Sequence, residues 1–221
     1  MPALGRRSRR LLLLAAIATA TLTLGACAGP GSNDGGDASG GELVWAIEGA
    51  NLAAGHMDPQ TSQLDVSAMV QRGVLDSLVF QNADGTFAPW LATEWQVSDD
   101  GLRYTFTLRD DVIFHDGTPF TAEDVIFSYN RSRGDGSDVK SKVGSIKEIR
   151  KLDDHTIDVV TNEPFPTLPD MLTDWYIMSK KWCEENRAVQ PVDKRKGSEN
   201  TASFKANGTG PFRLRSRDPN V

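Results

Sequence analysis

The sequence is poor in the residues on which most enzymes and metal proteins depend. Its 221 residues include two cysteines and three histidines, and His56, His115 and His155 are scattered along the chain. It has no Gly-x-Ser-x-Gly nucleophile elbow, no His-Glu-x-x-His zinc motif, no phosphate-binding loop and no dinucleotide fingerprint. Adjacent strand residues point to opposite faces, so His115 and Asp116 are predicted to stabilise a turn and not to form an acid–base pair. We therefore expect a protein that is not an enzyme, with no catalytic residue, metal site or cofactor.

Long apolar runs and clustered positive charge are also lacking outside the N-terminus. The apolar run 11–24 is too short and too rich in Ala and Thr for a confident membrane span. It follows four arginines within residues 6–10, an order typical of a signal peptide, here residues 1–26. Removing this segment takes away four arginines and no acidic residue, so the net charge changes from −6 to −10. An acidic domain argues against nucleic acid as a partner, because nucleic-acid binding needs clustered basic charge.

The end of the signal segment carries one of the two cysteines. Leu24-Gly25-Ala26-Cys27 resembles a lipobox, in which the thiol is acylated and cleavage leaves Cys27 as the first residue. An ordinary signal peptide with an incidental cysteine is the alternative, and export by the general or the twin-arginine route stays open. Residues 27–41 are predicted to be a lipidated cysteine followed by a flexible Gly/Ser-rich linker. Cys183 then has no disulfide partner and is expected to be a packed apolar residue.

The rest of the sequence mixes strand and helix patterns. Alternating apolar and polar residues predict strands, at about 42–48, 103–109, 145–151, 156–161 and 210–215. Helical spacing predicts helices, after Asp65, at 122–133 and, less regularly, at 168–182. Residues 82–85 are expected to form a turn and residues 187–207 a long surface loop, while Trp90, Trp95 and Trp175 are expected in the core. The predicted fold class is therefore α/β, of mixed α+β type.

Residues 114–124 are the most informative stretch of the chain. Asp116-Gly117 followed by Thr118-Pro119 predicts a turn, since Gly tolerates positive φ and Pro fixes its own φ. Thr121 is the predicted N-cap of the following helix, with Asp124 completing a variant capping box. Phe120 and Val125 occupy the positions of a hydrophobic staple. We infer that this stretch is scaffold and not a site of chemistry.

Five stretches occur in an order that resembles a known family. They are Met57-Asp58-Pro59-Gln60, residues 89–109, residues 114–124, residues 152–166 and Gly208-Thr209-Gly210-Pro211-Phe212. Together they resemble the bacterial extracellular solute-binding proteins of family 5, the dipeptide- and oligopeptide-binding components of ABC importers. The resemblance runs from about residue 42 to residue 217.

The resemblance implies a periplasmic-binding-protein-like fold of type II, incomplete and represented by its N-terminal portion. Residues 42–221 would hold part of the first lobe, in residues 42–65 and 204–221, and a small inserted subdomain, in residues 66–203. The family's second lobe would be missing, either because the chain is truncated or because it is a genuine short paralogue.

The implied function is that of a lipid-anchored, extracytoplasmic substrate-binding protein for peptides or a related small solute. Its partners would be that ligand, the ABC permease subunits and, through the lipid, the outer face of the cytoplasmic membrane; a periplasmic location is the other possibility. A non-transporting surface lipoprotein, acting as a sensor or interaction module with a degenerate binding fold, is the alternative. The ligand itself stays open. The ligand-binding residues suggested by the resemblance are Thr61, Ser62, Gln63, Asp65, Asn207, Gly208 and Thr209.

Overall fold

A computed structural model of the chain describes residues 57–62 and 65–217. The predicted signal segment, the lipobox at Cys27, the linker, the strand at 42–48 and Gln63 lie outside these residues. Within the described part, no helix is both long enough and apolar enough to cross a membrane.

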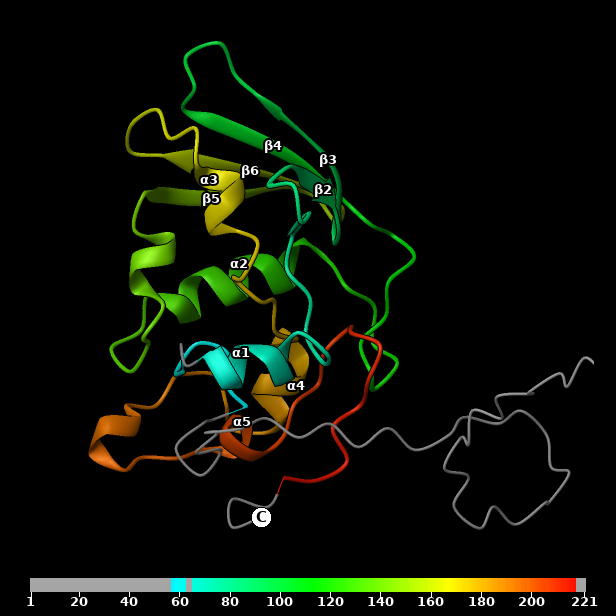
Figure 1. The fold of residues 1–221 in the computed structure, drawn as a ribbon, viewed down its shortest axis with the longest axis vertical. Coiled ribbons are helices and arrows are strands. Elements are labelled where there is room, and N and C mark those ends of the chain that lie inside the picture. The colour runs from blue at the N-terminus through cyan, green and yellow to red at the C-terminus, as the bar shows by residue number, and fades with distance from the viewer. Residues whose placement is uncertain (1–56, 63–64, 218–221) are drawn as a thin grey trace, which may run out of the picture. The chain divides into compact units, whose positions relative to one another are not determined.

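The main sheet has four antiparallel strands in the order β3-β4-β6-β5 (Figure 1). Its strands are β3 (Ala92–Val97), β4 (Arg103–Leu108), β5 (Ile146–Asp153) and β6 (Thr156–Thr161). β4 shows why the alternation predicted a strand, because Tyr104, Phe106 and Leu108 are buried while the residues between them are more exposed. Three of the predicted strands are thereby confirmed.

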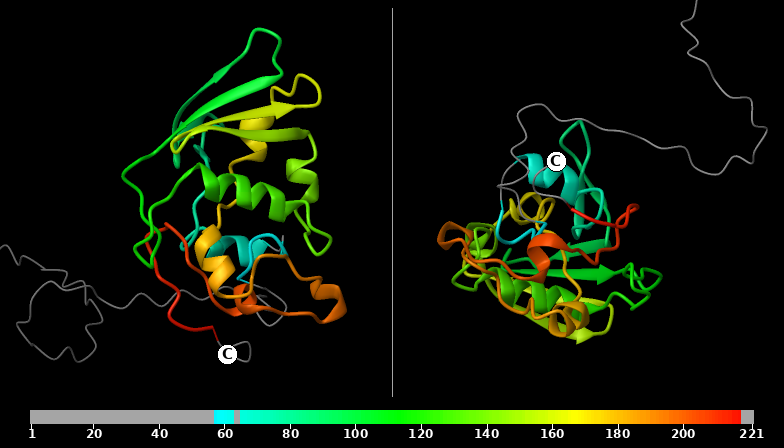
Figure 2. Two further views of the ribbon diagram at one scale, coloured as in Figure 1. Left: turned by 180° about the vertical axis from the view of Figure 1, so that it is seen from behind. Right: turned by 90° about the horizontal axis from the view of Figure 1, so that it is seen from below.

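Helix α2 (Ala122–Ser132) lies against one face of this sheet (Figures 1 and 2). Its N-terminus has the predicted capping box: the Thr121 side chain accepts a hydrogen bond from the helix backbone, and Asp124 accepts one from the Thr121 N–H at 2.9 Å. Phe120 and Val125 are both buried in the core below the helix, as expected of a staple. The capped helix is therefore confirmed in type and extent.

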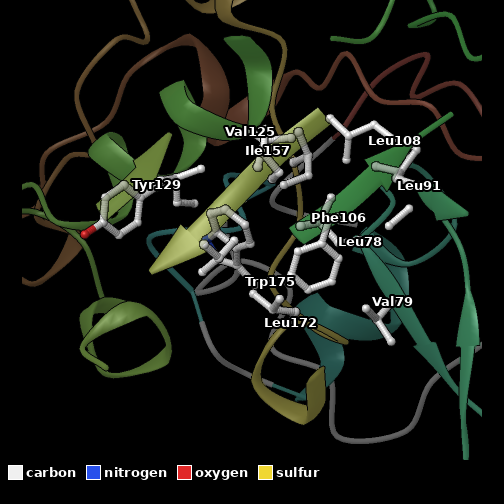
Figure 3. Close-up of a cluster of buried hydrophobic side chains, with 14 of the residues drawn as sticks. Leu78, Val79, Leu91, Phe106, Leu108, Val125, Tyr129, Ile157, Leu172 and Trp175 are labelled. Atoms are coloured by element: carbon white, nitrogen blue, oxygen red, sulfur yellow. The ribbon is translucent and has the colours of Figure 1, made fainter. Parts of the chain in front are cut away.

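The core fills the space between α2, the sheet and the segment that follows β6 (Figure 3). Trp175 is its largest buried side chain, 1% exposed, and its indole N–H donates to Ser132 Oγ at 2.8 Å. Cys183 is also fully buried, and burial raises the pKa of its thiol to about 12. The predictions of a packed, unreactive Cys183 and a core Trp175 are confirmed.

Shorter elements surround this core. The hairpin of β1 (Val79–Gln81) and β2 (Phe87–Pro89) turns at residues 82–85, as predicted. The short helices are α1 (Asp65–Gln71), α3 (Leu168–Met171), α4 (Lys180–Glu185) and α5 (Thr201–Phe204), with 3-10 turns η1 (Lys140–Val143) and η2 (Lys194–Lys196).

Three sequence predictions are wrong. Residues 210–215 form no strand, because their backbone has no neighbouring strand among the described residues; Gly210 N and Phe212 N instead donate to the carbonyls of Val74 and Gly73. Residues 187–207 are not simply a surface loop, since they contain η2 and α5 and bury Ala188 and Ala202 in a small apolar cluster with Cys183. Trp90 is not a core residue, because its side chain is 44% exposed.

Candidate functional site

The loop 207–210 is held by the side chain of His115. The Gly208 N–H donates to His115 Nδ1 at 3.3 Å, and His115 Nε2 lies 2.7 Å from the carbonyl oxygen of Gly210. Since Nδ1 accepts, the proton must sit on Nε2, which donates to Gly210. The backbone N–H of His115 adds a third bond, to the Gly208 carbonyl oxygen. The predicted turn role of His115 is thus wider than expected, because the ring joins residues almost a hundred positions apart and both of its nitrogens are committed to structure.

The neighbouring Asp116 supports the same loop. Its carboxylate accepts bonds from Thr118 N and Thr118 Oγ1, and its backbone N–H donates to Asn207 Oδ1 at 3.1 Å. Burial alone would raise the pKa of Asp116, but the hydrogen bonds from Thr118 and the interaction with Asn207 outweigh it and lower that pKa. The turn at 116–119 and the loop at 207–210 therefore behave as one joined unit.

Gly208 permits the closest backbone approach in this region. A Cβ atom placed on Gly208 would lie 1.9 Å from the carbonyl oxygen of Val74, far inside van der Waals contact. Gly210 N donates to this same carbonyl oxygen, at 3.1 Å. The loop therefore requires glycine at position 208 because its backbone presses on the residues after α1.

Thr209 links the loop to the side chain of Asp76. Its hydroxyl donates to Asp76 Oδ2 at 2.7 Å, and the indole N–H of Trp90 donates to Asp76 Oδ1, also at 2.7 Å. Each carboxylate oxygen thus receives one short, charge-assisted bond. Asp76 joins three segments that are distant in the sequence: the loop after α5, the residue after β2 and the stretch between α1 and β1.

Asp76 lines a cavity of about 100 Å³ that opens to the surface. The aromatic rings of Phe80 and Trp90 pack against each other on one wall, with centroids 5.2 Å apart, and both side chains are partly exposed. Arg72 and Tyr176 also line the cavity, and Arg72 Nε donates to the Tyr176 hydroxyl oxygen at 3.2 Å. Burial raises the pKa of Tyr176, so the phenol is neutral at physiological pH. Gln81 and Thr173 complete the rim together with Leu75 and Ser77.

The segment 58–62, which contains the predicted ligand residues Thr61 and Ser62, is held by a buried ion pair. Asp58 and Arg131 are both fully buried, with Arg131 Nη2 donating to Asp58 Oδ2 at 2.6 Å and Nη1 donating to Oδ1 at 2.9 Å. Arg131 Nη1 also donates to Gln60 Oε1 at 2.8 Å, and Nε donates to the Ala188 carbonyl oxygen at 2.9 Å. One guanidinium on α2 therefore fastens the segment 58–62 to the segment around residue 188.

The predicted ligand residues that the structure describes do not come together in one place. Thr61 and Ser62 are buried in the segment fastened by Arg131. Asp65 is the first residue of α1. Asn207 and Gly208 hold the loop, and Thr209 hydrogen-bonds Asp76 but does not itself line the cavity.

Sequence reasoning overlooked the side chains that form the cavity itself. Asp76, Arg72 and Tyr176 belong to no recognisable motif, so no local signal singled them out. Trp90 carried a usable signal, since a tryptophan directly after a proline at a strand end is a poor candidate for a core position. Among the described residues there is no group of three or more His, Cys, Asp or Glu side chains placed to hold a metal ion.

Comparison with known proteins identifies the family. Residues 86–221 match the family described as bacterial extracellular solute-binding proteins, family 5 Middle. The chain is 31% identical, over 159 residues, to a probable peptide ABC transporter periplasmic-binding protein, y4tO, of Sinorhizobium fredii; the match covers 71% of this chain and 28% of that protein.

Solved structures agree with this match. NikZ from Campylobacter jejuni, in complex with Ni(L-His), superposes with a TM-score of 0.63 at 25% identity, covering 74% of this chain and 31% of NikZ. The periplasmic binding protein DppA from Helicobacter pylori, in complex with the peptide STSA, gives a TM-score of 0.58 at 32% identity, covering 72% of this chain and 34% of DppA.

The chain thus spans about a third or less of the length of these relatives, and the predicted type II periplasmic-binding-protein fold is present in part. The ordered motifs, the antiparallel sheet with its capped helix and these matches together place the chain: it belongs to the bacterial extracellular solute-binding proteins of family 5.

Proposed function

We propose that this chain is the N-terminal part of an extracytoplasmic substrate-binding protein of an ABC importer, which takes up peptides or a related small solute. The observation that carries the proposal is the family match over residues 86–221. Two of the relatives support the solute class, since one is named for a peptide transporter and another was solved with a bound peptide.

The described geometry suits one wall of such a binding site. The cavity beside Asp76 combines aromatic faces with a few fixed polar groups, the usual composition of a small-molecule site. Its polar groups are held by bonds between segments distant in sequence, so they are placed before a ligand arrives. We expect the mechanism to be capture between two lobes followed by hinge closure and docking on the permease, with no covalent step.

Uptake measurements test the importer role. In a strain that lacks the gene, we expect uptake of a radiolabelled di- and tripeptide mixture to fall, and to return when the wild-type gene is supplied. Uptake of labelled glucose serves as the control and is expected to be unchanged. If deletion changes the uptake of neither the peptides nor a nickel–histidine complex, importer function is refuted and the chain is better explained as a non-transporting surface lipoprotein.

We further propose that the protein is anchored by lipid at Cys27, on the outer face of the cytoplasmic membrane. Labelling cells with a radioactive fatty acid should tag the wild type and leave Cys27→Ser unlabelled. Cys183→Ala is the matched control, since it removes the other cysteine, which is buried and free, and it should be labelled like the wild type. Equal labelling of Cys27→Ser and the wild type would refute the anchor.

A further inference from the structure

Arg72 presents a positively charged group at the rim of the cavity beside Asp76. Its side chain is exposed, and Nε is committed to the Tyr176 hydroxyl. Tyr176 is 5% exposed, so it is a fixed partner and limits the positions that the guanidinium can take. Within the described part of the chain, the two terminal nitrogens of Arg72 have no hydrogen-bond partner and no carboxylate within ion-pair distance. They form a fork of donors, the geometry that binds a carboxylate through two parallel bonds.

Asp76 is the second charged side chain that lines the cavity. Both of its oxygens already accept short bonds, from Trp90 Nε1 and from Thr209 Oγ1. These bonds hold Asp76 as a structural junction between distant segments, while its carboxylate keeps its negative charge. Of the two charged side chains that line the cavity, Asp76 already has a protein partner on each oxygen, whereas Arg72 keeps two unused donor nitrogens, and the ligand group that these donors favour is an anion.

The aromatic wall determines what accompanies that anion. The rings of Phe80 and Trp90 are tilted by 31° to each other, and their side chains are 42% and 44% exposed. Two large aromatic side chains left in contact with water beside a donor fork match a flat or apolar group, which gains free energy when it covers them. The indole ring of Trp90 is also held in place, because its N–H donates a hydrogen bond to Asp76.

The volume sets the size of the ligand group. A cavity of about 100 Å³ is too small for a whole peptide, since sites that enclose a small molecule usually measure several hundred cubic ångströms. It has room for one end group.

We propose that this cavity is a subsite for the carboxylate end of a small solute, with Arg72 binding the carboxylate and the Phe80–Trp90 pair covering an adjacent aromatic or apolar group. The identification of that solute as an imported one rests on the proposed function, whereas the chemistry of the subsite does not. The recognised class is a carboxylate attached to an apolar group, as at the C-terminus of a hydrophobic peptide.

A matched pair of probes tests the subsite on the full-length chain purified in detergent. N-acetyl-L-phenylalanine carries the carboxylate, and N-acetyl-L-phenylalaninamide replaces it by a neutral group of the same shape; neither has a free amine. We expect calorimetric titration to show the acid binding about tenfold more tightly than the amide, the effect of one charge-assisted bidentate contact. Arg72→Gln should abolish this preference and Arg72→Lys should restore part of it.

Two further variants separate the contribution of apolar contact from that of the Arg72 charge. Trp90→Ala should weaken the binding of the acid and of the amide alike, because it removes apolar surface and not charge. Arg103→Gln is the matched control, an exposed arginine on β4 that does not line the cavity, and it should leave both affinities unchanged. The proposal is overturned if acid and amide bind equally, if neither binds, or if the preference survives in Arg72→Gln.

The outcome can be separated from that of the importer role. If the purified protein prefers the acid but deletion of the gene leaves peptide uptake unchanged, import is refuted and the subsite is supported. Uptake that depends on the gene, together with probes that bind equally or not at all, would refute the subsite and leave import standing.

Discussion

The buried ion pair between Asp58 and Arg131 gives the sharpest prediction about stability. Both side chains are fully buried, and Asp58 supplies both carboxylate oxygens to a guanidinium that has no access to water. Asp58→Asn keeps the shape of the side chain and removes its charge, which leaves Arg131 buried as an uncompensated cation. Removal of one partner of a buried pair costs about 3–5 kcal/mol. Because domains of this size are stable by only about 5–15 kcal/mol, the variant should lose a large part of its free energy of unfolding.

Urea denaturation followed by tryptophan fluorescence measures this loss, since Trp175 lies in the core. With an m-value of about 2 kcal/mol per molar urea, the midpoint of Asp58→Asn should fall by about 2 M. Asp111→Asn is the matched control, because the Arg109–Asp111 pair has the same N–O distance of 2.6 Å and is exposed to solvent. That control should leave the midpoint almost unchanged, as exposed pairs contribute little.

A double variant keeps the test informative if Asp58→Asn does not fold. Asp58→Leu combined with Arg131→Met removes both charges and replaces them with apolar side chains, so it should fold and recover much of the lost stability. Equal midpoints for Asp58→Asn and Asp111→Asn would refute the reasoning. A double variant less stable than Asp58→Asn would show that the pair is held by more than charge compensation.

Three further changes have defined outcomes in the same denaturation assay. Gly208→Ala should destabilise by about 1–3 kcal/mol, because its Cβ would press on the Val74 carbonyl, while Gly144→Ala, whose nearest contact is 3.4 Å, should have little effect; equal midpoints would contradict the close approach. The pKa of Asp116 is lower in the folded state than its ordinary value of 3.8. Its ionised carboxylate therefore stabilises the fold at pH values above 3.8, and this stabilisation is lost as the pH falls through the lowered pKa. Asp116→Asn should therefore be less stable than the wild type near pH 7, and the difference should shrink as the pH falls through the lowered pKa; a difference that does not change with pH would argue against the charge. Thr121→Ala should cost about 1 kcal/mol by removing the N-cap of α2, and a neutral result would mean that the capping box adds no stability.

The parts of the fold that depend on local sequence were predictable. The alternation at 103–109 and the capping signal at Thr121 each act within a few residues, and both elements occur where the patterns placed them. The strand expected at 210–215 shows the limit of such patterns. Extended residues become a strand only when another strand supplies bonding partners, and in the described chain these residues bond instead to the turn at Gly73–Val74.

The site was predictable only in small part. The resemblance pointed to the loop at 207–209, whose role in ligand binding stays a prediction; in the fold Thr209 bonds Asp76, one of the side chains that line the cavity. Arg72, Asp76 and Tyr176 could not be found from spacing, since they come from the end of α1, the stretch after it and the segment before α4. An arginine or an aspartate at such places is most often a solvated surface residue. What distinguishes these side chains is the set of partners that the folded chain brings to them.

The sequence by itself determined the family, the class of fold and the scaffold role of residues 114–124, because ordered motifs, periodicity and capping residues are local properties of the chain. Only the tertiary structure decided which polar side chains are structural and which are available to a ligand. A histidine beside an aspartate, as at His115, suggests chemistry in the sequence, yet the fold commits both ring nitrogens of His115 to hydrogen bonds with a distant loop. Arg72 is unremarkable in the sequence and Trp90 was expected in the core, yet the fold leaves both lining a cavity. The reason is that the groups of a side chain left without partners depend on all of its neighbours in the fold and not only on those beside it in the chain.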